Sequence, residues 1–313
     1  MNKNDIIKKY NKRLCPSCHM DDKIINSKIS SPYPSELLPF RANKESWEGL
    51  FYRKTKSFFS YYKCNNCKLI YAPEHYSSQQ LSNLYKQTTP NMEQVPKKLL
   101  KKTQFEYFQL LKKWSGLKGN YLEVGPDIGL FTQQCLLNGE FDYYWLFEPN
   151  NLVKSQLTKL LGDRKHKIYP TIDKIDKIDN KILSTAILIH VLDHLLEPQK
   201  ILKKLREKMR PGGVILIVTH DESSIMRKFF GWRWLPFCQQ HPQLFNYKTT
   251  EDILNRCGFK VLDQRKSKNY FEISFLLNNL LWIFGFKIKK LPRWLNVPVG
   301  LRLGNIITIA SAA

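Results

Sequence analysis

Long hydrophobic runs are absent from this 313-residue sequence. No segment reaches the roughly 18 unbroken apolar residues that a membrane-spanning helix needs. The first twelve residues are polar and lack the apolar core of a secretory signal peptide. We therefore expect no transmembrane segment and a cytoplasmic location, with a peripheral position at the inner face of the membrane left open.

Acidic residues are scarce in the chain. Lys and Arg number 50 and Asp and Glu number 27, which gives a formal net charge of +23. Such an excess favours anionic partners such as phosphates, nucleotide-linked substrates, nucleic acid or an anionic membrane surface. The lysines are scattered along the whole chain and accompany many Asn and Ile residues, so a compositional bias explains the excess equally well.

Cysteine is also scarce. The chain has seven cysteines, which are too few for a disulfide scaffold in a chain of this length. The apolar fraction of 42% and the charged fraction of 25% are ordinary for a globular protein. They exclude disordered, collagen-like and coiled-coil chains. The length suggests about two domains and leaves enough chain to bury a proper core.

Four of the cysteines form two CxxC pairs, Cys15 with Cys18 and Cys64 with Cys67. Two such turns supply the four sulfur ligands that tetrahedral Zn²⁺ prefers. The pairs are separated by residues 19–63, a longer spacing than in compact zinc modules. We expect a structural zinc site with no open position for catalysis, and His19 at the surface. Four free thiols in a small core, or a redox dithiol, are the alternatives.

From about Gly119 the sequence alternates short apolar runs with helical patterns, which is typical of a parallel sheet covered by helices on both faces. The first expected strand is 121–124, followed by a glycine turn at 125–129 and a helix at 130–137. The next strand, 143–147, ends at Glu148, about twenty positions after the turn. That arrangement is typical of nucleotide-binding folds, in which the turn approaches a ligand and the acidic residue binds a ribose.

The remaining pattern continues the same fold. We expect a buried strand at 182–189 and a helix that begins at Pro198 and stops at Pro211-Gly212-Gly213. A strand at 214–219 follows, and Thr249 and Thr250 are expected to cap a helix at 251–257. Strands at 259–262 and 306–309 complete the set.

The sequence resembles the class I S-adenosylmethionine-dependent methyltransferases. In particular, it resembles members with an N-terminal zinc-ribbon-like region, such as some sugar and surface-polysaccharide-cluster methyltransferases. The matching segments are Leu122–Gly129, Phe147–Pro149, His190–His194, Pro211–Gly213, the Gly258-Phe259 turn, and Tyr62–Tyr71 with Leu84-Tyr85. The resemblance implies a Rossmann-like, doubly wound α/β sheet and S-adenosylmethionine as cofactor. It does not specify the acceptor.

By this resemblance, a loop shaped by Glu123, Gly125 and Gly129 holds the methionine part of the cofactor, and Glu148 holds its ribose. Asp127 occupies the place of the family's middle glycine, and His190 lines the cofactor site. On the acceptor side, the candidates for a general base are His194, His220, Asp221 and His241. For His194 a structural role at the entry of a helix is the favoured interpretation.

The expected organisation is a zinc-binding region at residues 1–90, a connecting helix within 91–118, and a methyltransferase domain at 119–313. Two stretches, at about 223–247 and 264–303, interrupt the domain. The aromatic residues of the first either contact an acceptor ring or pack the stretch onto the sheet. The apolar segment 271–286, followed by the basic residues Lys287, Lys289, Lys290 and Arg293, is expected to form a lid, an interfacial helix within 271–293, or a dimer contact.

The leading functional hypothesis is methyl transfer to a small molecule, most simply a sugar, sugar nucleotide or glycan precursor. An RNA methyltransferase is an alternative, because a zinc ribbon and a basic surface also fit RNA modification. A zinc-dependent scaffold without activity is a third hypothesis. It rests only on Asp127, which occupies the place of a glycine in the family.

Overall fold

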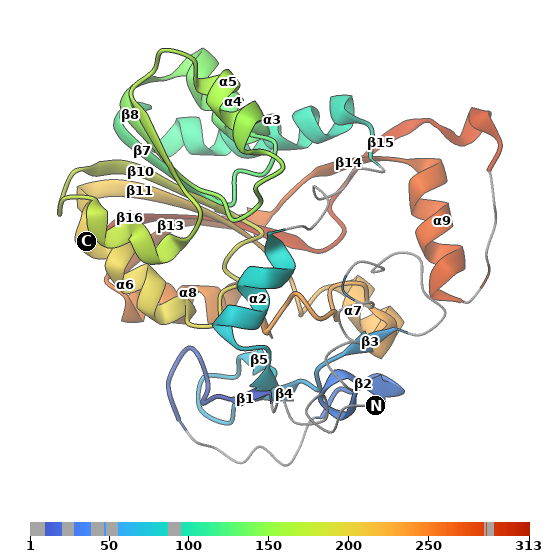
Figure 1. The fold of residues 1–313 in the computed structure, drawn as a ribbon. Coiled ribbons are helices and arrows are strands. Elements are labelled where there is room, and N and C mark those ends of the chain that lie inside the picture. The colour runs from blue at the N-terminus through green and yellow to red at the C-terminus, as the bar shows by residue number, and fades with distance from the viewer. Residues whose placement is uncertain are drawn as a thin grey trace, which may run out of the picture.

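A seven-stranded sheet organises the computed structural model, which describes residues 10–20, 28–38, 47, 56–86, 95–284, 286 and 291–313 (Figure 1). The strand order is β13-β16-β11-β10-β7-β8-β9. The strands are β7 (Lys118–Val124), β8 (Glu140–Phe147), β9 (His166–Tyr169), β10 (Leu183–Ile189), β11 (Met209–His220), β13 (Phe259–Lys266) and β16 (Asn305–Ala312). All neighbours pair in parallel except β16, which lies antiparallel between β11 and β13.

Alternate residues of the strands enter two different cores, because successive side chains of a strand point to opposite faces. Tyr121 and Ile187 belong to one core, whereas Leu122 and Leu188 belong to the other. The first core is closed by α3 (Lys97–Trp114), α4 (Leu130–Asn138) and α5 (Lys154–Leu161). The second is closed by α6 (Pro198–Lys208) and α8 (Tyr247–Arg256). The chain therefore has the expected doubly wound α/β fold.

Where the structure describes it, the N-terminal region contains short strands, a 3₁₀ turn and the helix α2. They are β1 (Asn11–Lys12), β2 (Tyr33–Pro34), β3 (Ser57–Phe58), β4 (Tyr62–Lys63), β5 (Ile70–Tyr71), β6 (Glu74–His75), the 3₁₀ turn η2 (Ser35–Leu37) and α2 (Ser78–Tyr85). The capping box of Ser77 and Gln80 fixes the start of α2. Figure 1 shows α2 (cyan) between the main sheet and these short strands.

The stretch after β11 adds to this region. It forms α7 (Ile225–Phe230), the 3₁₀ turn η4 (Gly231–Arg233) and β12 (Gln243–Leu244). β12 pairs with β5, so a strand from the second half of the chain completes a three-stranded sheet of the N-terminal region. Trp234 and Phe237 are buried beside Phe58 and Tyr61. These aromatics thus pack the stretch onto the N-terminal region.

The second interrupting stretch forms an arm, which we define as residues 269–301. It contains β14 (Asn269–Glu272), α9 (Ile273–Ile283), η5 (Arg293–Leu295) and β15 (Pro298–Leu301), and β14 pairs with β15. Lys287, Lys289 and Lys290 lie outside the described residues. In Figure 1, α9 stands apart from the main sheet at the side of the molecule. Among the described residues, no helix has the length and apolar character needed to cross a membrane.

Two expected helix boundaries are wrong. The helix after β12 begins at Tyr247, because the side chain of Asn246 accepts a hydrogen bond from the Thr249 amide and the Thr249 hydroxyl accepts one from the Asn246 amide. Thr249 is therefore the third residue of a capping box. The helix α6 ends at Lys208, and Pro211-Gly212-Gly213 forms a bulge inside β11, between the pairs made by Met209 and Val214.

Candidate active site and cysteine cluster

The loop after β7 adopts a backbone that favours glycine. Gly125, Asp127 and Gly129 have φ angles of 65°, 50° and 76°, so every second residue is left-handed. A Cβ at Gly125 would lie 2.9 Å from a methyl of Val191, and one at Gly129 would lie 2.6 Å from a methyl of Leu160. Asp127 tolerates the left-handed conformation better than most residues. The loop therefore keeps its shape although an aspartate replaces the middle glycine.

Glu123 lies directly beneath this loop. Its carboxylate is buried and accepts hydrogen bonds from the Tyr121 hydroxyl at 2.6 Å and from the Thr132 hydroxyl. Burial raises the pKa of Glu123 to about 7. Because Thr132 lies in the first turn of α4, Glu123 ties the loop to the start of that helix.

Glu148 follows β8 and points back at the loop. One carboxylate oxygen accepts a hydrogen bond from the Asp127 amide at 2.9 Å, and the other accepts one from the Asn150 amide at 2.8 Å. Burial raises the pKa of Glu148 to about 7. Each oxygen keeps a lone pair with which it can accept a hydroxyl of a bound ligand. The structure thus joins the two predicted cofactor segments, which are about twenty residues apart.

Four histidines gather at the carboxyl ends of β10 and β11. The ring centroids lie 4.7 Å apart for His190 and His220, 4.8 Å for His220 and His241, and 4.6 Å for His241 and His194. His190 and His194 follow β10, His220 ends β11, and His241 comes from the stretch before β12. The structure therefore brings three of the four predicted base candidates together with His190.

The partners of His194 and His241 determine which of their ring nitrogens donate hydrogen bonds and which accept them. The Pro236 carbonyl can only accept, so Nδ1 of His241, 2.6 Å away, carries a proton. Nε2 of His241 then accepts from Nε2 of His194 at 3.1 Å. This leaves Nδ1 of His194 to accept from the Tyr85 hydroxyl at 2.8 Å. Since Tyr85 ends α2, the N-terminal region reaches the histidine cluster.

His220 keeps one nitrogen available. Its Nδ1 lies 3.0 Å from Oδ1 of Asn305, so Nδ1 donates and the lone pair stays on Nε2. Oδ2 of the buried Asp193 lies 3.9 Å from that Nε2 and accepts the His220 amide at 3.3 Å. The His220 side chain remains 21% exposed. Nε2 therefore keeps its lone pair and has a carboxylate near it.

Burial disfavours the charged form of three of the four histidines. It lowers the pKa of His190 and His194 to about 3 and that of His220 to about 4. A neutral imidazole is the form that accepts a proton. The pKa of Asp193 would be raised by burial but is lowered overall by the neighbouring histidines, His220 foremost.

Asp221 is not brought into this cluster. One of its carboxylate oxygens accepts hydrogen bonds from the amide and the hydroxyl of Ser223, at 2.9 and 2.5 Å. This closes a turn at the start of the stretch that leads to α7. Conversely, Tyr85 and Asn305 were not predicted as site residues, because nothing local in the sequence distinguishes them from other surface-forming Tyr and Asn residues.

The four cysteines converge at a second place. Their sulfur atoms all lie within 4.8 Å of one another, with Cys15 and Cys67 3.5 Å apart and Cys18 and Cys64 3.5 Å apart. A tetrahedron with Zn–S distances of about 2.3 Å has S···S edges of about 3.8 Å. His19 is exposed and hydrogen-bonds Gln199, outside the sulfur group, as expected for a surface residue.

The two CxxC turns have the same backbone. In the first, His19 donates its amide to the Cys15 carbonyl at 2.8 Å, and in the second Lys68 donates to the Cys64 carbonyl at 3.0 Å. His19 and Lys68 also share a left-handed φ, of 57° and 63°. Two equivalent turns that face each other supply four convergent sulfurs, which is a donor set that fits zinc.

A buried cation accompanies the sulfurs. The Nε and Nη1 atoms of Arg13, two residues before Cys15, are buried and have no hydrogen-bond partner among the described residues. Its Nη2 donates to Gln243 at 2.6 Å. Four thiolates around Zn²⁺ carry a net charge of −2, which a nearby guanidinium offsets. The surroundings thus also fit a zinc-bound state.

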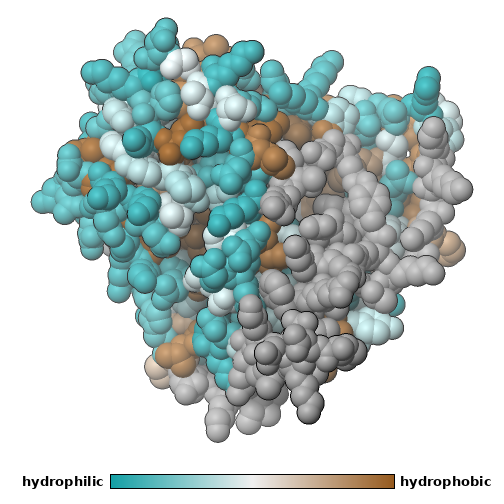
Figure 2. All heavy atoms as spheres, viewed as in Figure 1, coloured by the Kyte–Doolittle hydropathy of each residue, from teal (hydrophilic) through white to brown (hydrophobic). Residues whose placement is uncertain are grey.

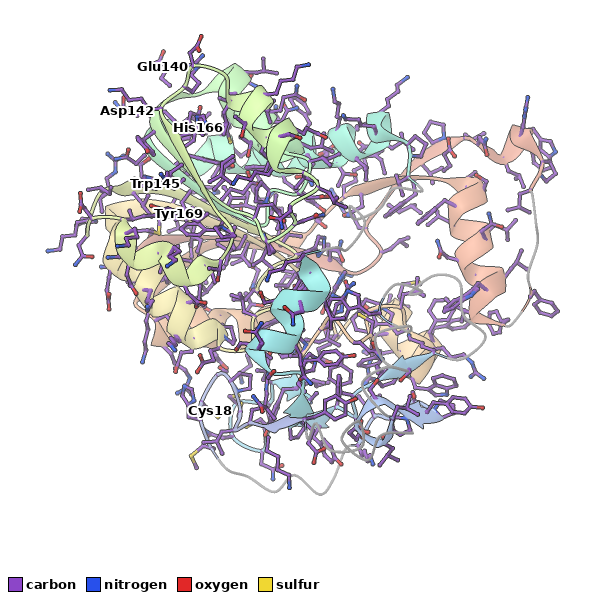
Figure 3. The ribbon with its side chains drawn as sticks, viewed as in Figure 1. Cys18, Glu140, Asp142, Trp145, His166 and Tyr169 are labelled. Atoms are coloured by element: carbon purple, nitrogen blue, oxygen red, sulfur yellow. The ribbon has the colours of Figure 1, made fainter. Side chains whose placement is uncertain are left out.

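A shallow hollow lies at the opposite edge of the sheet. Glu140, Asp142 and Arg164 line it at the amino end of β8. Figure 3 shows Glu140 and Asp142 at one corner of the molecule and Cys18 at the opposite side. Ligands of doubly wound sheets bind at the carboxyl ends of the strands. We therefore place the candidate site at the loop after β7 and the histidine cluster, and not at this hollow.

Comparisons with known proteins agree with this geometry. A family model described as a methyltransferase domain matches residues 93–264. The chain belongs to this family. The match includes the loop after β7, Glu148 and the histidine cluster, and the enzyme is an S-adenosylmethionine-dependent methyltransferase. A comparison of this chain with curated proteins found no match.

Solved structures share the fold. A Bacillus halodurans protein described as a methyltransferase has a TM-score of 0.51 and 11% identity, with 66% of this chain and 98% of that chain covered. A chain from the complex between the Haloferax volcanii Trm112 methyltransferase activator and a methyltransferase has a TM-score of 0.50 and 9% identity, with 69% and 92% covered. At such low identity these likenesses establish the fold alone.

Proposed function

We propose that the methyltransferase modifies a small-molecule acceptor, namely a sugar, sugar nucleotide or glycan precursor. The observation that carries this proposal is the histidine cluster at the carboxyl ends of the strands. Its rings contact Tyr85 of the N-terminal region and Trp234 of the stretch after β11. An uncharged His220 beside these aromatic side chains suits the hydroxyl groups of a small polar molecule.

Nε2 of His220 is the proposed proton acceptor. S-adenosylmethionine, when bound, supplies a methyl group on a positively charged sulfur, which is a good leaving group. Asn305 holds the His220 ring with its Nε2 lone pair available, and Asp193 stabilises the imidazolium that forms when the proton arrives. The enzyme's remaining task is to orient the acceptor hydroxyl and exclude water.

The cofactor residues have separate roles in this proposal. Glu148 accepts the two ribose hydroxyls, because its carboxylate is already oriented by the Asp127 and Asn150 amides. Glu123, Gly125 and Gly129 shape the loop against which the methionine part lies. His190, whose φ of 52° is left-handed, lies between the loop and His220 and lines the cofactor.

Zinc at the cysteine cluster is proposed to be structural. Cys15, Cys64 and Cys67 are buried in the same core as α6 and α8. Gln199, in the first turn of α6, donates to the Ser17 carbonyl at 3.2 Å, which joins the first CxxC turn to the sheet-covering helix. The metal would thus hold the N-terminal region, and Tyr85 with it, against the methyltransferase domain.

The proposal is tested with methyl-labelled S-adenosylmethionine and two acceptor pools, nucleotide sugars and total RNA. We expect label transfer to the nucleotide-sugar pool, with loss of transfer in His220→Asn at unchanged S-adenosylhomocysteine affinity. Transfer to RNA alone would contradict the small-molecule acceptor. Unchanged transfer in His220→Asn would contradict the role of His220.

A further inference from the structure

The arm and α7 expose large apolar side chains side by side. We call Ile225, Phe229, Leu280, Phe284, Phe286 and Trp294 the apolar face, and all six are solvent-exposed. Ile225 and Phe229 are 71% and 70% exposed, and Trp294 is 74% exposed. Exposed apolar side chains are normal singly but not in groups, where they mark contact surfaces.

The apolar face spans three neighbouring elements, with α7 near the end of α9 and η5 near its start (Figure 1). Ile225 and Phe229 are four residues apart on α7, and Leu280 lies four residues before Phe284 at the end of α9, so each pair shares one side of its helix. The rings of Phe230 and Phe284 lie 6.4 Å apart and join α7 to α9. α9 also contacts η5, which carries Trp294.

The two segments that carry this face are basic, although Glu272 directly precedes α9. The sequence contains no Asp or Glu in residues 223–250 or 273–303. Lys228, Arg233, Arg293 and Arg302 belong to these two segments and are exposed. A surface that combines apolar side chains with positive charge is complementary to the headgroups and upper acyl chains of an anionic bilayer.

We propose that this face docks the methyltransferase onto an anionic lipid bilayer. The apolar side chains enter the headgroup boundary, with Trp294 at the interface, while the cations contact lipid phosphates. α9 has 11 residues and lies in the surface instead of crossing it. A second copy of the chain fits less well, because a two-fold contact would place these cations against each other.

Exposed apolar side chains also occur elsewhere on the described surface, and Leu37, at 77%, is the most exposed of them. Leu137 and Leu152 are 72% and 64% exposed, but they lie at the end of α4 and before α5, among polar residues. Figure 2 shows hydrophilic side chains over most of the sheet-containing half of the molecule, with hydrophobic ones in scattered patches. These two leucines therefore provide a matched control.

The experiment is co-sedimentation of the full chain with vesicles of mixed phosphatidylglycerol and phosphatidylcholine, or of phosphatidylcholine alone. We expect binding to the anionic vesicles and at least about tenfold weaker partitioning for Phe229→Ser with Phe284→Ser. The control, Leu137→Ser with Leu152→Ser, should partition as the wild type does. Affinity for S-adenosylhomocysteine should be equal in all three proteins, which separates lipid docking from folding and from methyl transfer.

Charge reversal tests the second half of the proposal. Lys228→Glu with Arg293→Glu should abolish the preference for anionic vesicles, and added salt should weaken wild-type binding. Several outcomes would overturn the proposal: no wild-type co-sedimentation, equal binding of the serine variant, or a dimer in sedimentation velocity that the serine variant dissociates. High-affinity RNA binding lost in the same variants would also overturn it.

Discussion

The loop after β7 and the histidine cluster lie at the same edge of one sheet but are built in different ways. The loop and Glu148 come from a single β-α-β unit of 31 residues, Lys118–Glu148, in which sequence neighbours contact each other. The histidine cluster combines residues that follow β10 and β11 with His241, Tyr85 and Asn305, which lie far apart along the chain. The comparison indicates that the proposed cofactor site is a local property, whereas the proposed acceptor site depends on assembly of the whole chain.

Substitution of His220 should give the largest difference between the effect on activity and the effect on cofactor affinity. In His220→Asn, kcat/KM is expected to fall by about 10³, because a positioned base contributes roughly 10² to 10⁴ in rate. The dissociation constant for S-adenosylhomocysteine, measured by calorimetry, should stay within about twofold of wild type. Equal losses of activity and of cofactor affinity would contradict independent sites.

Substitution of Glu148 should have the opposite pattern. Glu148→Ala removes the proposed acceptor of two ribose hydroxyls, so S-adenosylhomocysteine affinity is expected to fall by about a hundredfold, as for two hydrogen bonds to a charged group. Asp142→Ala, at an exposed acidic residue of β8, is the matched control and should bind normally. An unchanged dissociation constant in Glu148→Ala would refute the ribose assignment.

Zinc removal should lower methyl transfer more than it lowers cofactor affinity. Chelation is expected to lower methyl transfer by at least about tenfold and to open the first 90 or so residues to proteolysis, because Tyr85 loses its support. The cofactor site should remain largely intact, with S-adenosylhomocysteine affinity changed by less than about threefold. Unchanged proteolysis in verified metal-free protein would show that the cysteines are not ligands.

The change of cofactor affinity with pH should be smaller than the effects of these substitutions and of zinc removal. The pKa of Glu148 is raised to about 7, so the carboxyl is mostly protonated at pH 6 and mostly ionised at pH 8. Only the ionised form accepts both ribose hydroxyls, so affinity should rise by up to about tenfold from pH 6 to pH 8. Glu148→Gln should bind more weakly and with a flatter pH profile. A wild-type profile that falls with pH would contradict this.

Much of the fold could be predicted because its signals are local. The aliphatic run Leu183–Ile189, the glycine turn and Pro198 each specify their own element. The cofactor residues also belong to one such unit. Helix ends were less predictable where a side chain outside the expected helix decides them, as Asn246 does for α8.

The proposed acceptor site could be predicted only in part. His194, His220 and His241 were recognisable as residues after strands or in the stretch that follows β11. The contacts of Tyr85 and Asn305 depend on how α2 and β16 are placed in space, over sequence separations of 109 and 85 residues. The turn made by Asp221 depends on the direction of one side chain, which spacing does not specify.

Calorimetric titration with S-adenosylhomocysteine of wild type, His220→Asn and Glu148→Ala tests the central claim most directly, since this product binds without turnover and needs no acceptor. The account predicts saturable one-site binding in wild type, the same affinity in His220→Asn and a large loss in Glu148→Ala. Absence of binding in well-folded wild-type protein, or equal loss in both variants, would contradict it.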